Sequence, residues 1–210
     1  MIPITPNRYN MKTQMFTLII GLCLSLQACA QPIPDKEKQI SIAVMAAPED
    51  MREGATVLGF DAQGELVTLR EGTNSQVCVA DDPNREGFQA VCYHKDLTPF
   101  MDRGRALRAE GKNPKEIFDT REVEAKEGSL QMPEQPATLH LLEGKEVTWD
   151  AEAGTLDGAR YRYVVYIPFA TAESTGLPTS PIVPGAPWIM DPGTHRAHIM
   201  ITPPAPAESE

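Results

Sequence analysis

The chain has 210 residues and a formal net charge of −10 at pH 7, and 41% of its residues are hydrophobic. This length is enough for one domain with a proper core. The acidic excess repels phosphate backbones, and the basic residues between positions 102 and 127 alternate with acidic ones instead of forming a patch. We therefore expect no nucleic-acid partner.

An apolar and uncharged run, Met15–Ala30, follows Lys12 near the N-terminus. It is shorter than the roughly 20 residues that a membrane span needs, and its polarity is that of a secretory signal. Its end, Leu26-Gln27-Ala28-Cys29, resembles the lipobox of bacterial lipoproteins. The resemblance implies a signal peptide over residues 1–28 and a lipid on Cys29. Small residues around Cys29 also fit ordinary signal cleavage, which leaves a soluble periplasmic protein as the alternative.

The residue after Cys29 is alanine, not the aspartate associated with inner-membrane retention. The lipobox resemblance therefore implies an outer-membrane anchor, with the protein facing the periplasm or the surface. The membrane is then a partner through several acyl chains, since a single chain binds only marginally. We expect a tether over residues 29–38, one domain over 39–202 and a disordered tail over 203–210.

Apolar residues at helical spacing predict a short helix over residues 40–47, which ends before Pro48. A hairpin of strands 55–60 and 66–72 follows, and two further strands, 75–80 and 88–94, complete an expected antiparallel meander. The last two strands carry Cys78 and Cys92. In an oxidising compartment, cysteines on neighbouring strands predict a disulfide that closes a loop of about 15 residues.

Two helices, 98–110 and 114–127, follow the meander. Thr98 and Pro99 mark the first start, and Asn113, Pro114 and Glu116 mark the second. Their dense mixture of charges indicates solvated faces, whereas five apolar residues are expected to dock: Phe100, Met101, Leu107, Ile117 and Phe118.

Strands return at residues 137–144, 146–152 and 159–169, and a last strand starts at His198. Between them lies a long proline-rich loop, 170–194, of a length that is usually functional. Its large apolar residues predict a packed loop: Leu177, Ile182, Trp188 and Ile189. The fold class is α+β, an antiparallel sheet with an inserted pair of charged helices and this loop before the last strand.

Three short patterns resemble those of exported bacterial proteins of unassigned function. They are Ala46-Ala47-Pro48, Ala55-Thr56-Val57 and the run Leu69–Asn74 ahead of Cys78, and those proteins also close on a strand similar to "HIMI". The similarity covers about a third of the chain. It implies a shared fold and compartment, and no activity.

The stretch "DPGTHRAHIMI" holds the residues that are the best candidates for metal binding or catalysis. Asp191, His195 and His198, with His94 from the cysteine strands, are plausible ligands for zinc or copper. The alternative is that polar residues at a loop–strand junction bond to the loop backbone. Because side chains alternate along a strand, we expect Ile199 and Ile201 to face the deeper core. His198 is then expected under the loop near Asp191, with His195 reaching the same space.

Three functions stay open. The first is a lipid-anchored envelope protein that binds a protein partner or small ligand near the 170–194 loop. The second is a zinc- or copper-binding protein. The third is a metal-assisted hydrolase, in which Glu173 or Asp191 would act as the base. No other cofactor motif is present, and the sequence does not decide whether the protein is an enzyme.

Overall fold

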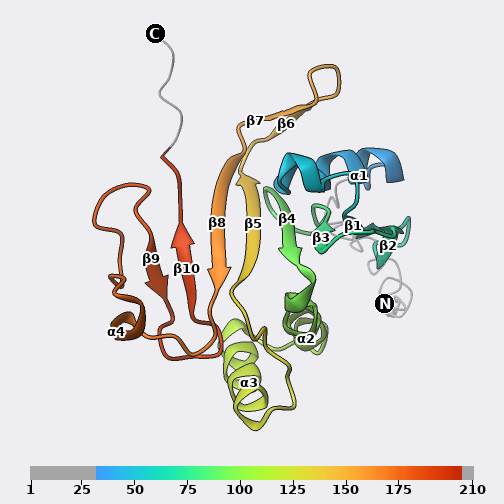
Figure 1. Cartoon of the computed structure of the whole chain (residues 1–210). Coiled ribbons are helices and arrows are strands. Elements are labelled where there is room, and N and C mark those ends of the chain that lie inside the picture. The colour runs from blue at the N-terminus through green and yellow to red at the C-terminus, as the bar shows by residue number, and fades with distance from the viewer. Residues whose placement is uncertain (1–31, 205–210) are drawn as a thin grey trace, which may run out of the picture. The chain divides into compact units, whose positions relative to one another are not determined.

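Runs rich in valine, leucine and tyrosine form ten strands in the computed structural model, which describes residues 32–204 (Figure 1). The predicted signal peptide, Cys29 and the end of the predicted tail lie outside the described residues. The strands are β1 (Thr56–Phe60), β2 (Leu66–Arg70), β3 (Gln76–Val79), β4 (Phe88–His94), β5 (Ala137–Gly144), β6 (Thr148–Asp150), β7 (Thr155–Asp157), β8 (Arg160–Tyr166), β9 (Trp188–Met190) and β10 (His198–Ile201).

Helices occupy the N-terminal end of the described chain and the middle, as an α+β fold requires, so the predicted class is confirmed. The α-helices are α1 (Lys36–Ala43), α2 (Thr98–Ala109), α3 (Pro114–Glu127) and α4 (Ala172–Thr175). The 3-10 helices are η1 (Val44–Ala46), η2 (Glu49–Met51) and η3 (Lys95–Leu97). The first helix begins four residues before the predicted start because Asp35 caps it, its carboxylate accepting from the Lys38 amide at 2.8 Å.

Eight strands form one mixed sheet in the order β2-β1-β3-β4-β5-β8-β10-β9, and β6 and β7 form a separate hairpin. The hairpin extends beyond the ends of β5 and β8 (Figure 1). The predicted meander over residues 55–95 is wrong at one step. After the β1–β2 hairpin, β3 does not pair with β2 but lies on the other side of β1, parallel to it. The remaining pairs in this sheet are antiparallel.

Two cores lie on opposite faces of the sheet, since side chains alternate along each strand. The first core joins α1 and η1 to inward residues of β1, β3, β4 and β5, among them Cys92 and Leu142. The second joins η3 and α2 to the opposite face, which includes Tyr93 and Leu141. Figure 1 shows α2 and α3 gathered at one end of the strands. Much of this second face therefore has no helix over it.

The charged helix α3 starts and ends where its sequence predicts. Asn113 accepts from the amides of Lys115 and Glu116 at 3.0 Å, and the Glu116 carboxylate accepts from the Asn113 amide at 2.9 Å. This capping box satisfies amides that the helix itself leaves free. Gly128, at φ +79°, ends the helix in the left-handed conformation that glycine adopts without strain.

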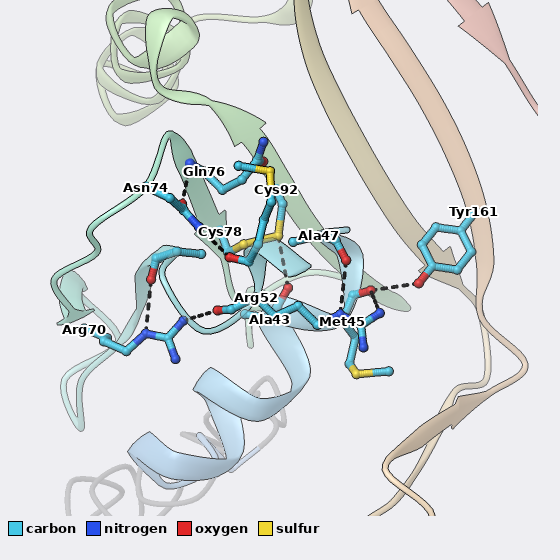
Figure 2. The surroundings of a disulfide bond; sticks show 12 residues. Ala43, Met45, Ala47, Arg52, Arg70, Asn74, Gln76, Cys78, Cys92 and Tyr161 are labelled. Atoms are coloured by element: carbon cyan, nitrogen blue, oxygen red, sulfur yellow. Dashed lines mark hydrogen bonds between the residues drawn. A yellow bond between two sulfur atoms is a disulfide. The ribbon is translucent and has the colours of Figure 1, made fainter. Parts of the chain in front are cut away.

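Cys78 and Cys92 form the predicted disulfide (Figure 2). The two residues are directly opposite in the β3–β4 pair, and both side chains are fully buried under η1. The carbonyls at the end of this helical segment are satisfied from two sides. Tyr161 of β8 donates to the Met45 carbonyl at 2.8 Å, and Arg52 donates to the Ala47 carbonyl at 3.1 Å. The bridge thus lies inside a core that already holds the N-terminal helix on the sheet.

Replacing both cysteines, Cys78→Ala with Cys92→Ala, should lower the free energy of unfolding by about 3 kcal/mol, because the loop of about 15 residues is no longer closed in the unfolded chain. Urea unfolding under oxidising conditions measures the difference. Adding dithiothreitol should destabilise the wild type and leave the double variant unchanged. A double variant as stable as the oxidised wild type would contradict this account.

Candidate functional site

The segment between β9 and β10 contains two of the predicted site residues, Asp191 and His195, and is tied to the end of β8. The Phe169 amide donates to the Thr194 carbonyl at 2.8 Å, and the Gly193 amide donates to the Ala170 carbonyl at 2.7 Å. Asp191 and Phe169 both have positive φ values, 52° and 63°. Non-glycine residues in this region carry strain, which the paired turns hold in place.

His195 is fully buried and pairs with Glu122 of α3. Glu122 Oε2 accepts from the His195 backbone amide at 2.8 Å and lies 2.6 Å from His195 Nδ1. Nδ1 therefore carries the proton of the neutral ring. Nε2 has no hydrogen-bond partner within residues 32–204. The ring is packed by aromatic neighbours, with centroids 5.0 Å from Phe118 and 5.8 Å from Phe100.

Burial favours a neutral imidazole in this pair, and hydrogen bonds favour an ionised carboxylate. Burial lowers the pKa of His195 below its ordinary value, and the hydrogen bond to Glu122 only partly offsets it. Burial alone would raise the pKa of Glu122, but hydrogen bonds from Lys126 and His195 outweigh it and lower that pKa to about 2. The pair thus links α3 to the last turn at neutral pH.

Arg121, the neighbour of Glu122 on α3, is also buried, although its helix was predicted to present charges to solvent. Its guanidinium lies 4.0 Å above the Phe100 ring and donates to the Phe100 carbonyl at 3.2 Å. Burial lowers the pKa of Arg121 to about 10. The prediction of a wholly solvated face is therefore wrong at this position, where a cation–π contact replaces part of the lost hydration.

His198 lies on the helix side of β10, opposite Tyr166 of β8, and is buried. Its Nδ1 donates to the Arg196 carbonyl at 2.7 Å, and its ring centroid is 5.2 Å from that of Tyr166. The expectation that Ile199 and Ile201 would take the deeper side is wrong, since both are only half-buried. The face that α2 and α3 cover is the one that carries His198.

The four residues predicted as metal ligands are not brought together. Asp191 accepts instead from Arg196 Nε at 2.7 Å. His94 is in β4, three steps across the sheet from β10, which is about 14 Å at the usual strand spacing. Its side chain also alternates to the face opposite Tyr93, away from His198. Ligands of one metal must each lie about 2 Å from it, so His94 cannot complete such a site with His198.

No group of three or more His, Cys, Asp or Glu side chains between residues 32 and 204 is placed to hold a metal ion. Glu173, the other predicted base, is exposed on α4. Ser174 next to it belongs to the capping box of that short helix with Thr171. None of the helices in the described part of the chain is long and apolar enough to cross a membrane.

The other candidate site is the surface of the loop between β8 and β9. Of the four large hydrophobic side chains that are exposed within residues 32–204, three belong to this loop: Phe169 at 40%, Ile182 at 77% and Val183 at 59%. Ile182 was predicted to pack, which is wrong. Ile189 packs as predicted and is fully buried.

A tight turn presents the two aliphatic side chains at the loop tip. The Ala186 amide donates to the Val183 carbonyl at 3.1 Å, and Gly185 has a φ of +84°. With Pro184 before this glycine, the turn is of type II, in which glycine supplies the positive φ. The sequence signal for it was Val183-Pro184-Gly185-Ala186, and nothing in that pattern says which side the neighbouring apolar residues face.

Comparisons with protein-family models, with curated proteins and with solved structures found no match for this chain.

Replacing the partner of His195, Glu122→Gln, should lower the free energy of unfolding by about 1–2 kcal/mol at pH 7, less than the full value of a carboxyl whose pKa falls from 4.5 to about 2, because part of that shift comes from the exposed Lys126. A lowered carboxyl pKa stabilises the fold above pH 4.5, and this stability is lost as the pH falls toward 2. The difference between wild type and variant should therefore shrink in urea unfolding at pH 3.

Glu127→Gln on the same helix is the matched control, because Glu127 is exposed. It should change the free energy of unfolding by less than about 0.5 kcal/mol at either pH. An effect of Glu122→Gln no larger than this control would refute the structural role of the pair.

Proposed function

We propose that this chain is a lipid-anchored cell-envelope protein that binds a protein partner through Ile182 and Val183 at the tip of the loop between β8 and β9. The observation that carries the proposal is that these two adjacent large hydrophobic side chains are 77% and 59% exposed on one tight turn. Exposed apolar groups that gather in this way mark interaction surfaces, whereas single ones are ordinary. Val123 on α3 is such a single residue.

The loop is well prepared for binding because little of it has to be ordered on contact. Prolines at positions 178, 181, 184 and 187 restrict the backbone. The Ile189 amide donates to the Pro178 carbonyl at 2.9 Å, which ties the outgoing part of the loop to the edge strand β9. Rigid presentation lowers the entropy cost of association. The two exposed aliphatic residues at the tip are thus held in place before a partner arrives.

Charge favours a protein partner over a lipid surface. Between residues 167 and 190 the only charged residue is Glu173, and there is no lysine or arginine. Segments that bind anionic membranes combine apolar residues with basic ones. This loop lacks the second component, so we assign membrane attachment to the lipid on Cys29 and protein binding to the loop.

Two features of the chain support a location in the cell envelope. The signal-like run and the lipobox resemblance favour a mature N-terminus at Cys29, and a buried disulfide between Cys78 and Cys92 is typical of oxidising compartments. Ala30 favours the outer membrane as the destination, with a soluble periplasmic protein as the alternative. The histidine arrangement gives no observation that favours a metal-dependent function.

Cys29→Ser should convert the protein from membrane-associated to soluble, because it removes the only predicted lipid attachment point. Fractionation of cells that express the full chain, followed by immunoblotting, measures this. Unchanged membrane association of the variant would contradict the anchor. This test is independent of the loop.

A photoreactive amino acid in place of Val183 should form one discrete protein adduct in intact cells, identified by mass spectrometry. The same residue in place of Val123 is the matched control, since Val123 is also aliphatic and 54% exposed but lies outside the loop. Adding Ile182→Asp should abolish the adduct at position 183. An adduct with lipid alone, or equal adducts at both positions, would contradict a protein-binding loop.

A further inference from the structure

A groove with an apolar floor and a basic rim lies over strands β1 to β4, at the opposite end of the strand order from β9 and β10. Its volume is about 930 Å³. Phe60, Leu66, Val79 and Val91 supply the strand side, and Met101 of α2 supplies the helix side. None of its lining residues comes from the loop between β8 and β9. The groove is therefore a site distinct from the proposed partner surface.

The rim of this groove is basic, whereas the protein as a whole is acidic. Three arginines line it, Arg85, Arg105 and Arg108, against one acidic lining residue, Asp82, and Asp102 beside them pairs with Arg105. The chain around them carries a net charge of −10. A local excess of positive charge in an acidic protein attracts anions to that place and to few others.

Two of the arginines are placed to act together. Arg105 and Arg108 are three residues apart on α2, so their side chains lie on the same side of the helix. Arg105 is held by Asp102 and donates to the Tyr93 hydroxyl at 3.3 Å. Arg108 and Arg85 are exposed and make no ion pair within residues 32–204. The rim thus has one fixed guanidinium with free ones beside it.

We propose that this groove binds a long-chain carboxylate, with its alkyl chain on Val79, Val91 and Met101 and its carboxylate at Arg105 and Arg108. The volume is within the usual range for small ligands, about 300–1,000 Å³. A carboxylate matches the fork of an arginine in charge and geometry. An alkyl chain matches an apolar floor of this kind, since it gains from every methylene removed from water.

The central strands under the groove disfavour an extended peptide as its occupant. β2, which contributes Leu66, is an edge strand, but β1, β3 and β4 each have a hydrogen-bonded neighbour on both sides. Their faces offer side chains but no free backbone groups, so a peptide strand would leave its own polar groups unpaired on an apolar surface. A hydrocarbon chain has no such groups to satisfy.

The test is an NMR titration of the full chain carrying Cys29→Ser with dodecanoate, below its micelle concentration and without detergent. Saturable shifts are expected at the amides of Val79, Val91 and Met101. Arg108→Glu should weaken binding about tenfold, because one attractive charge becomes repulsive. Arg160→Glu is the matched control, an exposed arginine on β8 outside the groove, and should leave the affinity unchanged.

Two further probes separate the contributions of chain and head group. Decanoate should bind several-fold more weakly than dodecanoate, because two methylenes fewer lie on the floor. Dodecyltrimethylammonium, which has the same chain and the opposite charge, should bind at least tenfold more weakly. The proposal is overturned if dodecanoate causes no saturable shift at these amides, if the cation binds equally well, or if Arg108→Glu binds like Arg160→Glu.

Discussion

The two hydrogen bonds that Glu122 accepts from His195 are the constraint on which the C-terminal half of this fold depends. They join α3 to the turn that feeds the last strand, in a place where an unpaired imidazole would be costly to bury. The same turn fixes the start of the loop that follows β8, because the Phe169 amide donates to the Thr194 carbonyl and the Gly193 amide donates to the Ala170 carbonyl. The position of the exposed loop thus depends on a contact made in the interior.

This arrangement divides the polar residues of the chain into two groups. The buried group includes His195, Arg121 and His198, whose contacts with Phe100, Phe118 and Tyr166 hold elements together. The exposed group includes Arg85 and Arg108, which have no partner charge in the described chain. Because helices cover only part of the sheet, the second group borders open apolar surface. We therefore place binding on the surface and not in the histidine cluster.

Local signals predicted part of this structure well. The start of α3 followed from Asn113, Pro114 and Glu116, because a capping box is made by residues three apart. The disulfide followed from two cysteines on neighbouring strands joined by a turn-rich segment. In both cases the interacting groups are close in sequence, so no knowledge of the remaining fold is required.

The errors share a different cause, which is long-range packing. The parallel β1–β3 pair and the burial of Arg121 depend on partners that no local pattern identifies. The side on which His198 lies was predicted from the cost of burying an imidazole. That argument assumed no partner, whereas the ring bonds to the Arg196 carbonyl and packs on Tyr166. Ile199 and Ile201 then take the opposite face of β10 and stay half-buried, despite their hydrophobicity.

The central claim is that His195 and His198 are structural and neutral, each with its proton on Nδ1. The ¹⁵N spectrum of the two imidazoles at pH 7, recorded before and after an equimolar addition of Zn²⁺, tests it most directly. The account predicts protonated Nδ1 and unprotonated Nε2 in both rings, with no change on adding zinc. Imidazolium signals at pH 7, or zinc-dependent shifts in both rings together, would contradict it.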